Sequence, residues 1–224
     1  MNHFFPEINI HIVAGTIGLL LGLIPILSVK GGRVHRRFGK VFALFAFVVL
    51  LTSVISIILR DKPTVAMLSR LTLMTSYMLF SAYRALKIAR SGPDFIDAGM
   101  AIAALLGAGV LSTYVLPRSS VPLAVANATL IGLAMVALYD LSRFYWKARW
   151  IASAAFIDHG VKMLAVFFGM LSAGAGNLFK QWQPWSSILP NVLGVIVMVM
   201  FAVLYFRKSS IHQNGFHQQT ELSR

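Results

Sequence analysis

Residues 41–59 read VFALFAFVVLLTSVISIIL, a run of 19 residues without one charged side chain. A helix rises about 1.5 Å per residue, so such a run approaches the roughly 30 Å of hydrocarbon that a transmembrane helix crosses. Comparable runs recur along the whole chain, which is 58% hydrophobic and only 12% charged. Soluble domains average about 25% charged residues. The sequence therefore indicates an integral membrane protein.

Seven apolar segments predict an all-α bundle of seven transmembrane helices in one domain, residues 1–208. A polar cytoplasmic tail, residues 209–224, is expected to be disordered because it has few apolar side chains to bury. Turn-forming pairs such as Gly31-Gly32 and Gly92-Pro93 separate the segments. The expected spans are about 8–29, 39–59, 64–86, 95–116, 121–141, 151–179 and 188–206.

The distribution of basic residues predicts the orientation. Four of the 20 Lys and Arg residues fall in the loops after the second, fourth and sixth spans, and two fall within spans. The other 14 lie in the alternate loops and the tail, the side that the positive-inside rule assigns to the cytoplasm. They are Lys30, Arg33, Arg36, Arg37, Lys40, Arg84, Lys87, Arg90, Arg143, Lys147, Arg149, Arg207, Lys208 and Arg224. The N-terminus is then outside, with Trp146 and Trp150 at the inner interface and Trp182 and Trp185 at the outer one.

Composition also excludes several classes of function. The net charge of +13 fits contact with anionic lipid headgroups, and the absence of a polar domain with interleaved aromatics argues against nucleic acid. The chain has no cysteine, which excludes disulfides and thiolate metal sites. No nucleotide-binding fingerprint or hydrolase motif is present. We therefore name no catalytic residue and do not expect an enzyme.

Four ionisable residues form a predicted inner layer: Asp140, Asp158, His159 and Lys162. Charged groups inside a span are costly and are functional candidates by default. Asp158 and Lys162 are four residues apart, so they share a helix face and can form an ion pair. Three readings stay open for this layer: structural pairing, a proton or ligand site, and a metal or haem site.

An outer layer is expected to contain His11, Arg70, Asn127 and Asn177. Arg70 needs an acceptor, which Glu7 or Asp61 could supply. This layer serves either helix packing or the binding of a ligand or ion. Between the first two spans, a cationic segment contains Arg33, His35, Arg36, Arg37 and Lys40. Contact with lipid phosphate is its simplest reading, and an anionic substrate or partner is the alternative.

Haem b is a further alternative, with His159 and either His11 or His35 as the iron ligands. His11 and His35 are 24 residues apart, about 36 Å along a helix, and lie on opposite sides of the membrane. His11 and His159 differ by roughly 12 Å in expected depth. A pair of His35 and His159 requires the loop that carries His35 to fold upward into the bundle.

Several motifs resemble those of an uncharacterised family of predicted bacterial multi-pass membrane proteins, a domain of unknown function. They include HxxxG from His11 to Gly15 and the GGRVHRRFGK segment of residues 31–40. Later elements are Tyr139-Asp140, Arg143-Phe144, His159-x3-Met163, Asn177, Pro184 and Pro190. The resemblance implies a location in the bacterial cytoplasmic membrane and supplies no activity.

Three functional hypotheses follow. The first is binding or transport of a small molecule or proton through the inner layer. The second is a haem-binding membrane redox protein. The third is a non-catalytic structural or partner-binding membrane protein in which the buried charges fix helix packing.

Overall fold

The computed structural model describes residues 6–59, 62–115 and 123–222, and the side chains of residues 7–59, 68–114 and 127–207. Every regular element in this part of the chain is helical, which confirms the all-α class. The α-helices are α1 (Pro6–Leu27), α2 (Arg33–Leu59), α3 (Lys62–Lys87), α4 (Phe95–Val110), α5 (Leu123–Ser142), α6 (Lys147–Ser153), α7 (Ala155–Leu178) and α8 (Trp185–Leu222). A π-helical turn, Leu111–Val115, extends α4, and a 3-10 turn, Lys180–Trp182, precedes α8.

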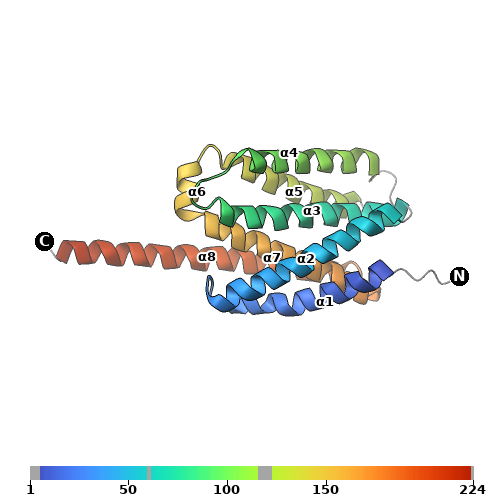
Figure 1. The fold of residues 1–224 in the computed structure, drawn as a ribbon, viewed down its shortest axis with the longest axis horizontal. Coiled ribbons are helices and arrows are strands. Elements are labelled where there is room, and N and C mark those ends of the chain that lie inside the picture. Colours follow the sequence, from blue (N-terminus) through green and yellow to red (C-terminus); the bar gives the residue numbers. More distant parts are fainter. Residues whose placement is uncertain (1–5, 60–61, 116–122, 223–224) are drawn as a thin grey trace.

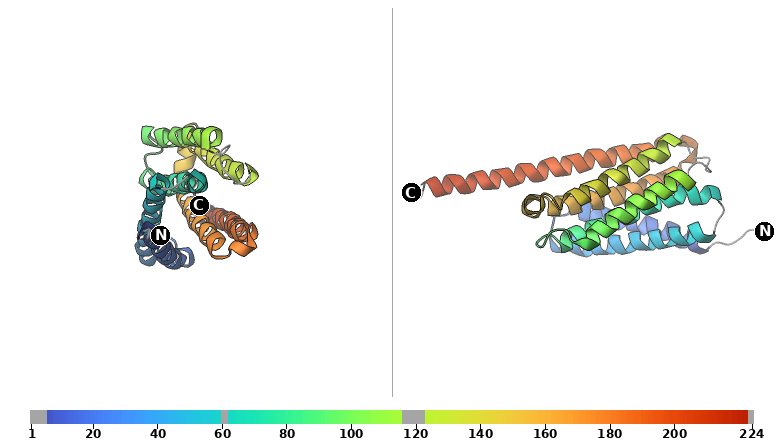
Figure 2. Two further views of the ribbon diagram at one scale, coloured as in Figure 1. Left: turned by 90° about the vertical axis from the view of Figure 1, so that its right-hand side faces the viewer. Right: turned by 90° about the horizontal axis from the view of Figure 1, so that it is seen from above.

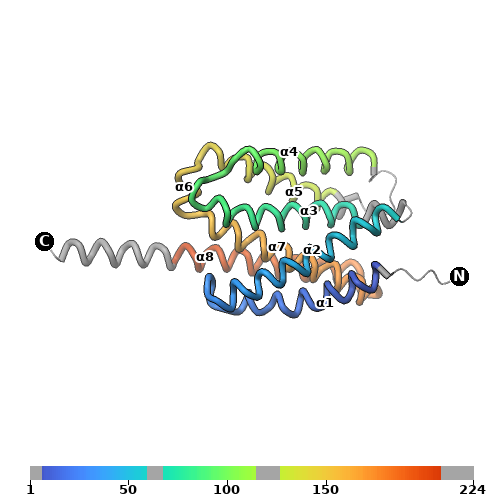
Figure 3. The backbone as a smooth tube through the Cα atoms, in the orientation of Figure 1, coloured from blue at the N-terminus to red at the C-terminus, as the bar shows by residue number. Residues whose placement is uncertain are grey.

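The long helices run side by side along one axis, and the short α6 lies across one end of the bundle (Figure 1). The turns α1–α2, α3–α4 and α5–α6 meet at the end where α6 lies, on the left of Figure 1. We call this the basic end, because Lys30, Arg33, Arg90 and Lys147 lie there. Helix α1 begins at the opposite end (Figures 1 and 3), and α8 extends past the basic end (Figures 1 and 2).

Helix α3 occupies the centre of the bundle, in contact with α2, α4, α5 and α7. The views down and across the bundle show it between the α1–α2 pair and the α4–α5 pair (Figure 2). Tyr77, Leu79, Ala82 and Ala85 are all buried although they point in different directions around the helix axis. Phe80 and Tyr83 on the remaining face are exposed, so protein covers most but not all of α3, and the covered faces can carry polar residues that pair within the bundle.

Five of the described helices are long and apolar enough to cross a membrane: α1, α2, α4 with its π-helical turn, α7 and α8. A sixth apolar segment, Asn127–Ser142 in α5, is shorter. Large apolar side chains are exposed on the outer faces, for example Leu20 at 63% on α1 and Leu204 at 61% on α8. Such faces suit lipid as the solvent. The protein is thus compatible with a multi-pass membrane protein, and the count of seven spans stays a prediction.

Three boundaries differ from those expected. Helix α2 begins at Arg33 rather than near residue 39, so the cationic segment is helical and not a loop. The expected span 151–179 is divided at Ala154 into α6 and α7: residues 151–153 belong to α6, which lies across the bundle, and they precede the apolar run of α7 without a break in hydropathy. The backbone of α8 continues to Leu222, so the expected disordered tail begins inside a helix.

Close packing joins α1, α2 and α7 through glycine. A Cβ atom at Gly22 would lie 2.8 Å from the ring of Phe42 and 2.9 Å from the ring of Phe167. Both rings are buried, and they lie 6.0 Å apart in the main apolar core. The GxxxG pair of α1, Gly18 and Gly22, therefore lets two other helices approach its backbone.

Candidate functional site

Four buried charged residues meet near the basic end of the bundle. Asp140 lies on α5, and Arg143 is the first residue after the end of that helix. Asp158 and Lys162 lie one turn apart on α7. Their exposed fractions are 2%, 1%, 6% and 3%. We call this group the charged tetrad. It brings together three of the four residues expected in the inner layer and adds Arg143, which the sequence analysis assigned to a loop.

Each cation of the tetrad contacts both carboxylates. Lys162 Nζ lies 2.5 Å from Asp140 Oδ1 and 2.7 Å from Asp158 Oδ1, which confirms the expected Asp158–Lys162 ion pair. Arg143 Nη1 lies 2.8 Å from Asp158 Oδ2, and Arg143 Nη2 lies 3.3 Å from Asp140 Oδ1. Two positive and two negative groups alternate, so the ionised tetrad is neutral. Mutual pairing is what makes four buried charges tolerable.

Helix α3 supplies the remaining partners of the tetrad. The hydroxyl groups of Tyr77 and Ser81 each donate to Asp140 Oδ2 at 2.6 Å. Lys162 Nζ also donates to Ser81 Oγ at 2.8 Å. Asp140 therefore accepts four contacts from three elements, and the tetrad ties α3, α5 and α7 to one another.

Helix α6 covers the tetrad on the side of the basic end. Trp150 is fully buried, and the guanidinium carbon of Arg143 lies 5.0 Å from the centre of its ring. The sequence analysis placed Trp150 at the headgroup level. In the structure the indole faces inward over Arg143, where a cation–π contact stabilises it, and its depth at the membrane interface stays a prediction.

Four polar residues of α3 lie on one face of the helix and form a stripe. Arg70, Tyr77, Ser81 and Arg84 are spaced at i, i+7, i+11 and i+14, which puts them on one face of a helix with 3.6 residues per turn. The stripe covers about 21 Å along the helix axis. Tyr77 and Ser81 at its middle contact the tetrad, whereas the apolar Leu73 and Met74 lie between Arg70 and Tyr77 on the same face of the helix.

At the basic end of this stripe, Arg84 binds the start of α4. Its Nε and Nη2 donate to the two carboxylate oxygens of Asp97 at 3.0 and 2.8 Å, and Nη2 also lies 2.7 Å from Asp94 Oδ1. Asp94 is the N-cap of α4 and accepts from the backbone N–H groups of Ile96 and Asp97. The hydrogen bond from Arg84 lowers the pKa of the Asp94 carboxyl.

The fourth residue of the expected inner layer, His159, does not join the tetrad. Its Nδ1 lies 2.9 Å from the carbonyl oxygen of Ala82 on α3. His35 makes a similar contact: its Nδ1 lies 3.0 Å from the carbonyl oxygen of Pro25 on α1. The two imidazoles are close enough to interact electrostatically. His35 lies in the first turn of α2, so the folded-up loop expected for this pair is not needed.

The four residues of the expected outer layer do not form one cluster. His11 Nδ1 lies 2.9 Å from Thr52 Oγ1 of α2. Asn127 is exposed, and the exposed Asn177 donates only to the Ala173 carbonyl of its own helix. Arg70 is buried, with 5% of its surface exposed, and its Nε and Nη1 have no hydrogen-bond partner. Of its two expected acceptors, Asp61 lies outside the described residues, and Glu7 does not accept a hydrogen bond from Nε or Nη1.

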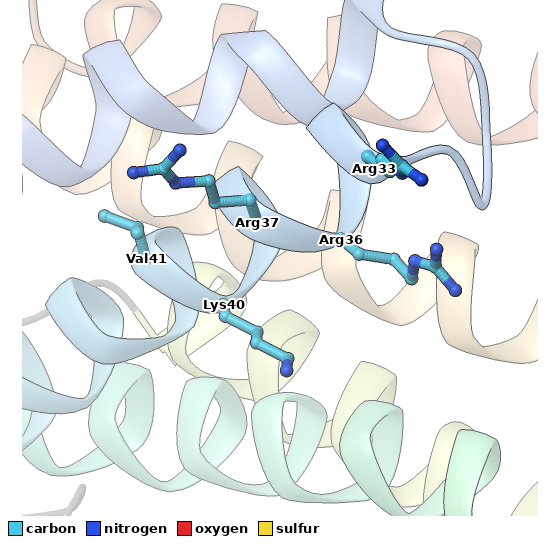
Figure 4. Close-up of a pocket in the computed structure, with 5 residues that line it drawn as sticks. All are labelled: Arg33, Arg36, Arg37, Lys40 and Val41. Atoms are coloured by element: carbon cyan, nitrogen blue, oxygen red, sulfur yellow. The ribbon is translucent and has the colours of Figure 1, made fainter.

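The cationic segment lines an open depression on the outside of α2, formed by Arg33, Arg36, Arg37, Lys40 and Val41. Figure 4 shows Arg37 and Val41 on one side of the helix and Arg36 and Lys40 on the other. The cationic tips therefore diverge and do not enclose one small ligand. His35 is separated from them by its contact with α1.

Sequence reasoning missed Tyr77, Ser81, Arg143 and the Arg84–Asp97 pair. The i, i+3 spacing of Asp140 and Arg143 at the end of a span was a usable signal, and so was the i, i+4 spacing of Tyr77 and Ser81. The pairing across helices had no such signal, because it depends on which faces of α3, α4 and α5 meet.

The chain was compared with protein-family models, with curated proteins and with solved structures, and none of the three comparisons gives a match. The resemblance of the HxxxG and GGRVHRRFGK motifs to a bacterial membrane-protein family therefore stays a prediction. The tetrad, the stripe and the pair of His35 and His159 are the structural features that bear on the function.

Proposed function

We propose that this multi-pass membrane protein binds and moves a small solute together with a proton, using the charged tetrad and the polar stripe of α3. One observation carries the proposal: two buried carboxylates, Asp140 and Asp158, share the same cation, Lys162, at 2.5 and 2.7 Å. Ionisable groups that face the interior of a membrane bundle mark proton and substrate pathways.

The tetrad couples protonation to helix position through its charge balance. A proton added to either carboxylate leaves a net positive charge in a buried site and removes one acceptor from Lys162. Because Lys162 also contacts Ser81, release from Asp140 loosens the contact between α5 and α7 and the contact of both with α3. A solute that enters along the stripe favours one arrangement of α3, α5 and α7, and protonation of a carboxylate favours the other, looser arrangement. This differential binding is what links the two fluxes.

The test is solute-driven proton movement in proteoliposomes that contain a pH-sensitive dye. Chloride, lactate and glycine are added outside in turn, and protein-free liposomes give the background. The wild-type protein is expected to change the internal pH with at least one solute, and Asp140→Asn is expected to abolish that change. Lys147→Gln, an exposed charge change at the same end, serves as the matched control. Signals from wild-type protein equal to the background for all three solutes would contradict the proposal.

A specific observation favours haem binding as a second candidate function. A carbonyl oxygen only accepts, so the contacts to Pro25 and Ala82 put the proton of His35 and His159 on Nδ1. Each Nε2 then carries a free lone pair on a ring held by a backbone carbonyl. This is the usual arrangement of a metal-ligating histidine. Haem b bound by these two residues would supply one-electron transfer.

An absorption spectrum of purified protein after addition of haem tests this second candidate. A Soret band that disappears in both His35→Ala and His159→Ala, and persists in His11→Ala, is the expected result. Protein that stays colourless with haem in excess rules haem out. A band that persists in either of the first two variants rules out this pair of ligands.

The cationic segment of α2 supports membrane lipid as a partner. Four divergent cations on about two turns of helix can each contact a separate headgroup phosphate, at about 1 kcal/mol per residue near an anionic surface. Their position at the basic end agrees with a cytoplasmic leaflet there. We therefore propose the bacterial cytoplasmic membrane as the location, with the N-terminus outside. Liposome flotation tests the lipid contact: binding that rises with phosphatidylglycerol content should fall in the Arg36→Gln/Lys40→Gln variant.

A further inference from the structure

We infer that Arg70 is the binding residue of an anion site, and that a small monocarboxylate is its ligand. The guanidinium lies in the half of α3 opposite to the basic end, eight residues or about 12 Å after the start of the helix. It is 95% buried, and its Nε and Nη1 have no hydrogen-bond partner in the structure. Other buried arginines of the described chain, Arg84 and Arg143, each contact two carboxylates.

A buried guanidinium with two unpartnered nitrogens is costly. A buried polar group without a partner costs about 1–3 kcal/mol, and a buried charge costs more. The next residues on the same face of α3 are apolar: Leu73 lies against Gly107 of α4, and Met74 lies against Gly132 of α5. Helix geometry puts Arg70, one turn before these two residues, on the face of α3 that is turned toward α4 and α5. An anion at this position would supply the acceptors that Nε and Nη1 lack.

Charge and shape select the class of anion. One guanidinium balances one negative charge, so a monoanion leaves the site neutral and a dianion leaves it negative in a medium that penalises charge. The donors of a guanidinium form a planar fork that matches the two oxygens of a carboxylate. Arg70 also begins the polar stripe that continues through Tyr77 to the tetrad. The inference thus names the solute class of the proposed function, but the site can exist without any transport.

The probe is radiolabelled lactate, whose binding to detergent-purified protein is measured by equilibrium dialysis. We expect saturable binding to the wild-type protein and at least a tenfold loss of affinity in Arg70→Gln. Arg70→Lys should bind with intermediate affinity, because it keeps the charge and loses the fork. Arg36→Gln removes an exposed arginine and should bind like the wild type. Sulfate, as a dianion, should compete more weakly than acetate.

Each outcome decides the inference. Binding that is equal in Arg70→Gln and wild type, or a folded wild-type protein without saturable binding, overturns it. Competition by laurate at lower concentration than acetate would identify a membrane-dissolved acid as the source of the carboxylate, and the reverse order would identify a water-borne one. Lactate binding without solute-driven proton movement would leave the Arg70 site standing and remove the transport function. Folding of Arg70→Gln is checked by circular dichroism, and a misfolded variant is replaced by Arg70→Met, which removes the fork without adding a polar group.

Discussion

At the scale of single residues, the charged tetrad behaves as one electrostatic unit. Asp158→Asn leaves Arg143 and Lys162 with one carboxylate between them, and Lys162→Met leaves Arg143 with two. Each single change therefore leaves an uncompensated buried charge, at a cost of about 3–5 kcal/mol in the free energy of unfolding. The double variant keeps the neutral Asp140–Arg143 pair, 3.3 Å apart. We expect it to be more stable than the sum of the single changes predicts.

Unfolding in mixed micelles measures this coupling by a double-mutant cycle. Lys147→Met, an exposed lysine of α6, combined with Asp158→Asn provides the control and should be additive. Additive behaviour of the Asp158–Lys162 cycle would show that the tetrad does not act as a unit. It would also remove the physical basis for coupling a proton to helix position.

The part of the site that sequence could predict is the part set by one helix. The Asp158–Lys162 pair follows from i, i+4 spacing alone. Asp140 was expected at the correct depth, because depth follows from residue number along a span. Arg143 was assigned to a loop. A cation near the end of a span fits the positive-inside rule, and the sequence alone does not show that it also has buried carboxylate partners. His159 was grouped with the tetrad by depth, although its ring contacts Ala82 on α3.

At the scale of elements, Gly22 controls how closely α1 approaches α2 and α7. Gly22→Ala places a methyl group within 3 Å of two buried rings, Phe42 and Phe167. Overpacking of this kind costs about 1–3 kcal/mol. Gly39→Ala is the matched control, since no atom lies within 4 Å of a Cβ at that position in α2. Thermal unfolding in detergent should show a lower midpoint for Gly22→Ala, and an unchanged or slightly higher one for Gly39→Ala. Equal midpoints would argue against close packing at Gly22.

The N-terminus of α4 should lose stability in acid. Arg84 lowers the pKa of the Asp94 carboxyl below its ordinary value of about 3.9. Because this pKa is depressed in the folded state, ionised Asp94 contributes to the free energy of unfolding. That contribution is fully present above the unfolded-state pKa and is lost as pH falls through the folded-state pKa. The stability of the wild-type protein should therefore fall below about pH 4 through this group.

Asp94→Asn isolates this contribution, because asparagine keeps the side-chain oxygen of the N-cap and removes the charge. The variant should be less stable than the wild type at pH 6, and the difference should shrink as pH falls below about 4. Hydrogen exchange of the first turn of α4 provides the local measurement. A difference that does not change with pH would show that the Asp94 charge contributes nothing.

Helix positions were predicted well wherever an apolar run ends at a turn. The structure places α1, α3, α5 and the start of α4 within a few residues of the expected spans. The errors have a common cause, which is that hydropathy measures apolarity and not direction. The end of α6 was read as part of a span although α6 lies across the bundle, and the cationic start of α2 was read as loop although it is helical.

At the scale of the whole molecule, the uneven distribution of basic residues between the two ends of the bundle predicts which end faces the cytoplasm. Arg84 and Arg143 are buried in ion pairs and do not face headgroups, so two of the 14 basic residues assigned to the cytoplasmic side do not count toward it. Exposed cations still gather at the basic end: Arg36 and Arg37 on α2, and Lys147 on α6. Moving them across a bilayer would be strongly unfavourable, so the basic end is expected in the cytoplasm.

Single-cysteine labelling checks the orientation directly, because the chain contains no cysteine of its own. Ser91→Cys lies in the turn at the basic end, Gln181→Cys lies in the turn before α8 at the opposite end, and neither change alters the charge. In intact spheroplasts, a membrane-impermeant maleimide should label only Gln181→Cys, and Ser91→Cys should react after permeabilisation. The reverse pattern would place the cationic segment outside the cell. It would also remove the argument for anionic cytoplasmic lipid as its partner, whereas the tetrad and the Arg70 site would be unaffected, because both rest on contacts within the bundle and not on the side they face.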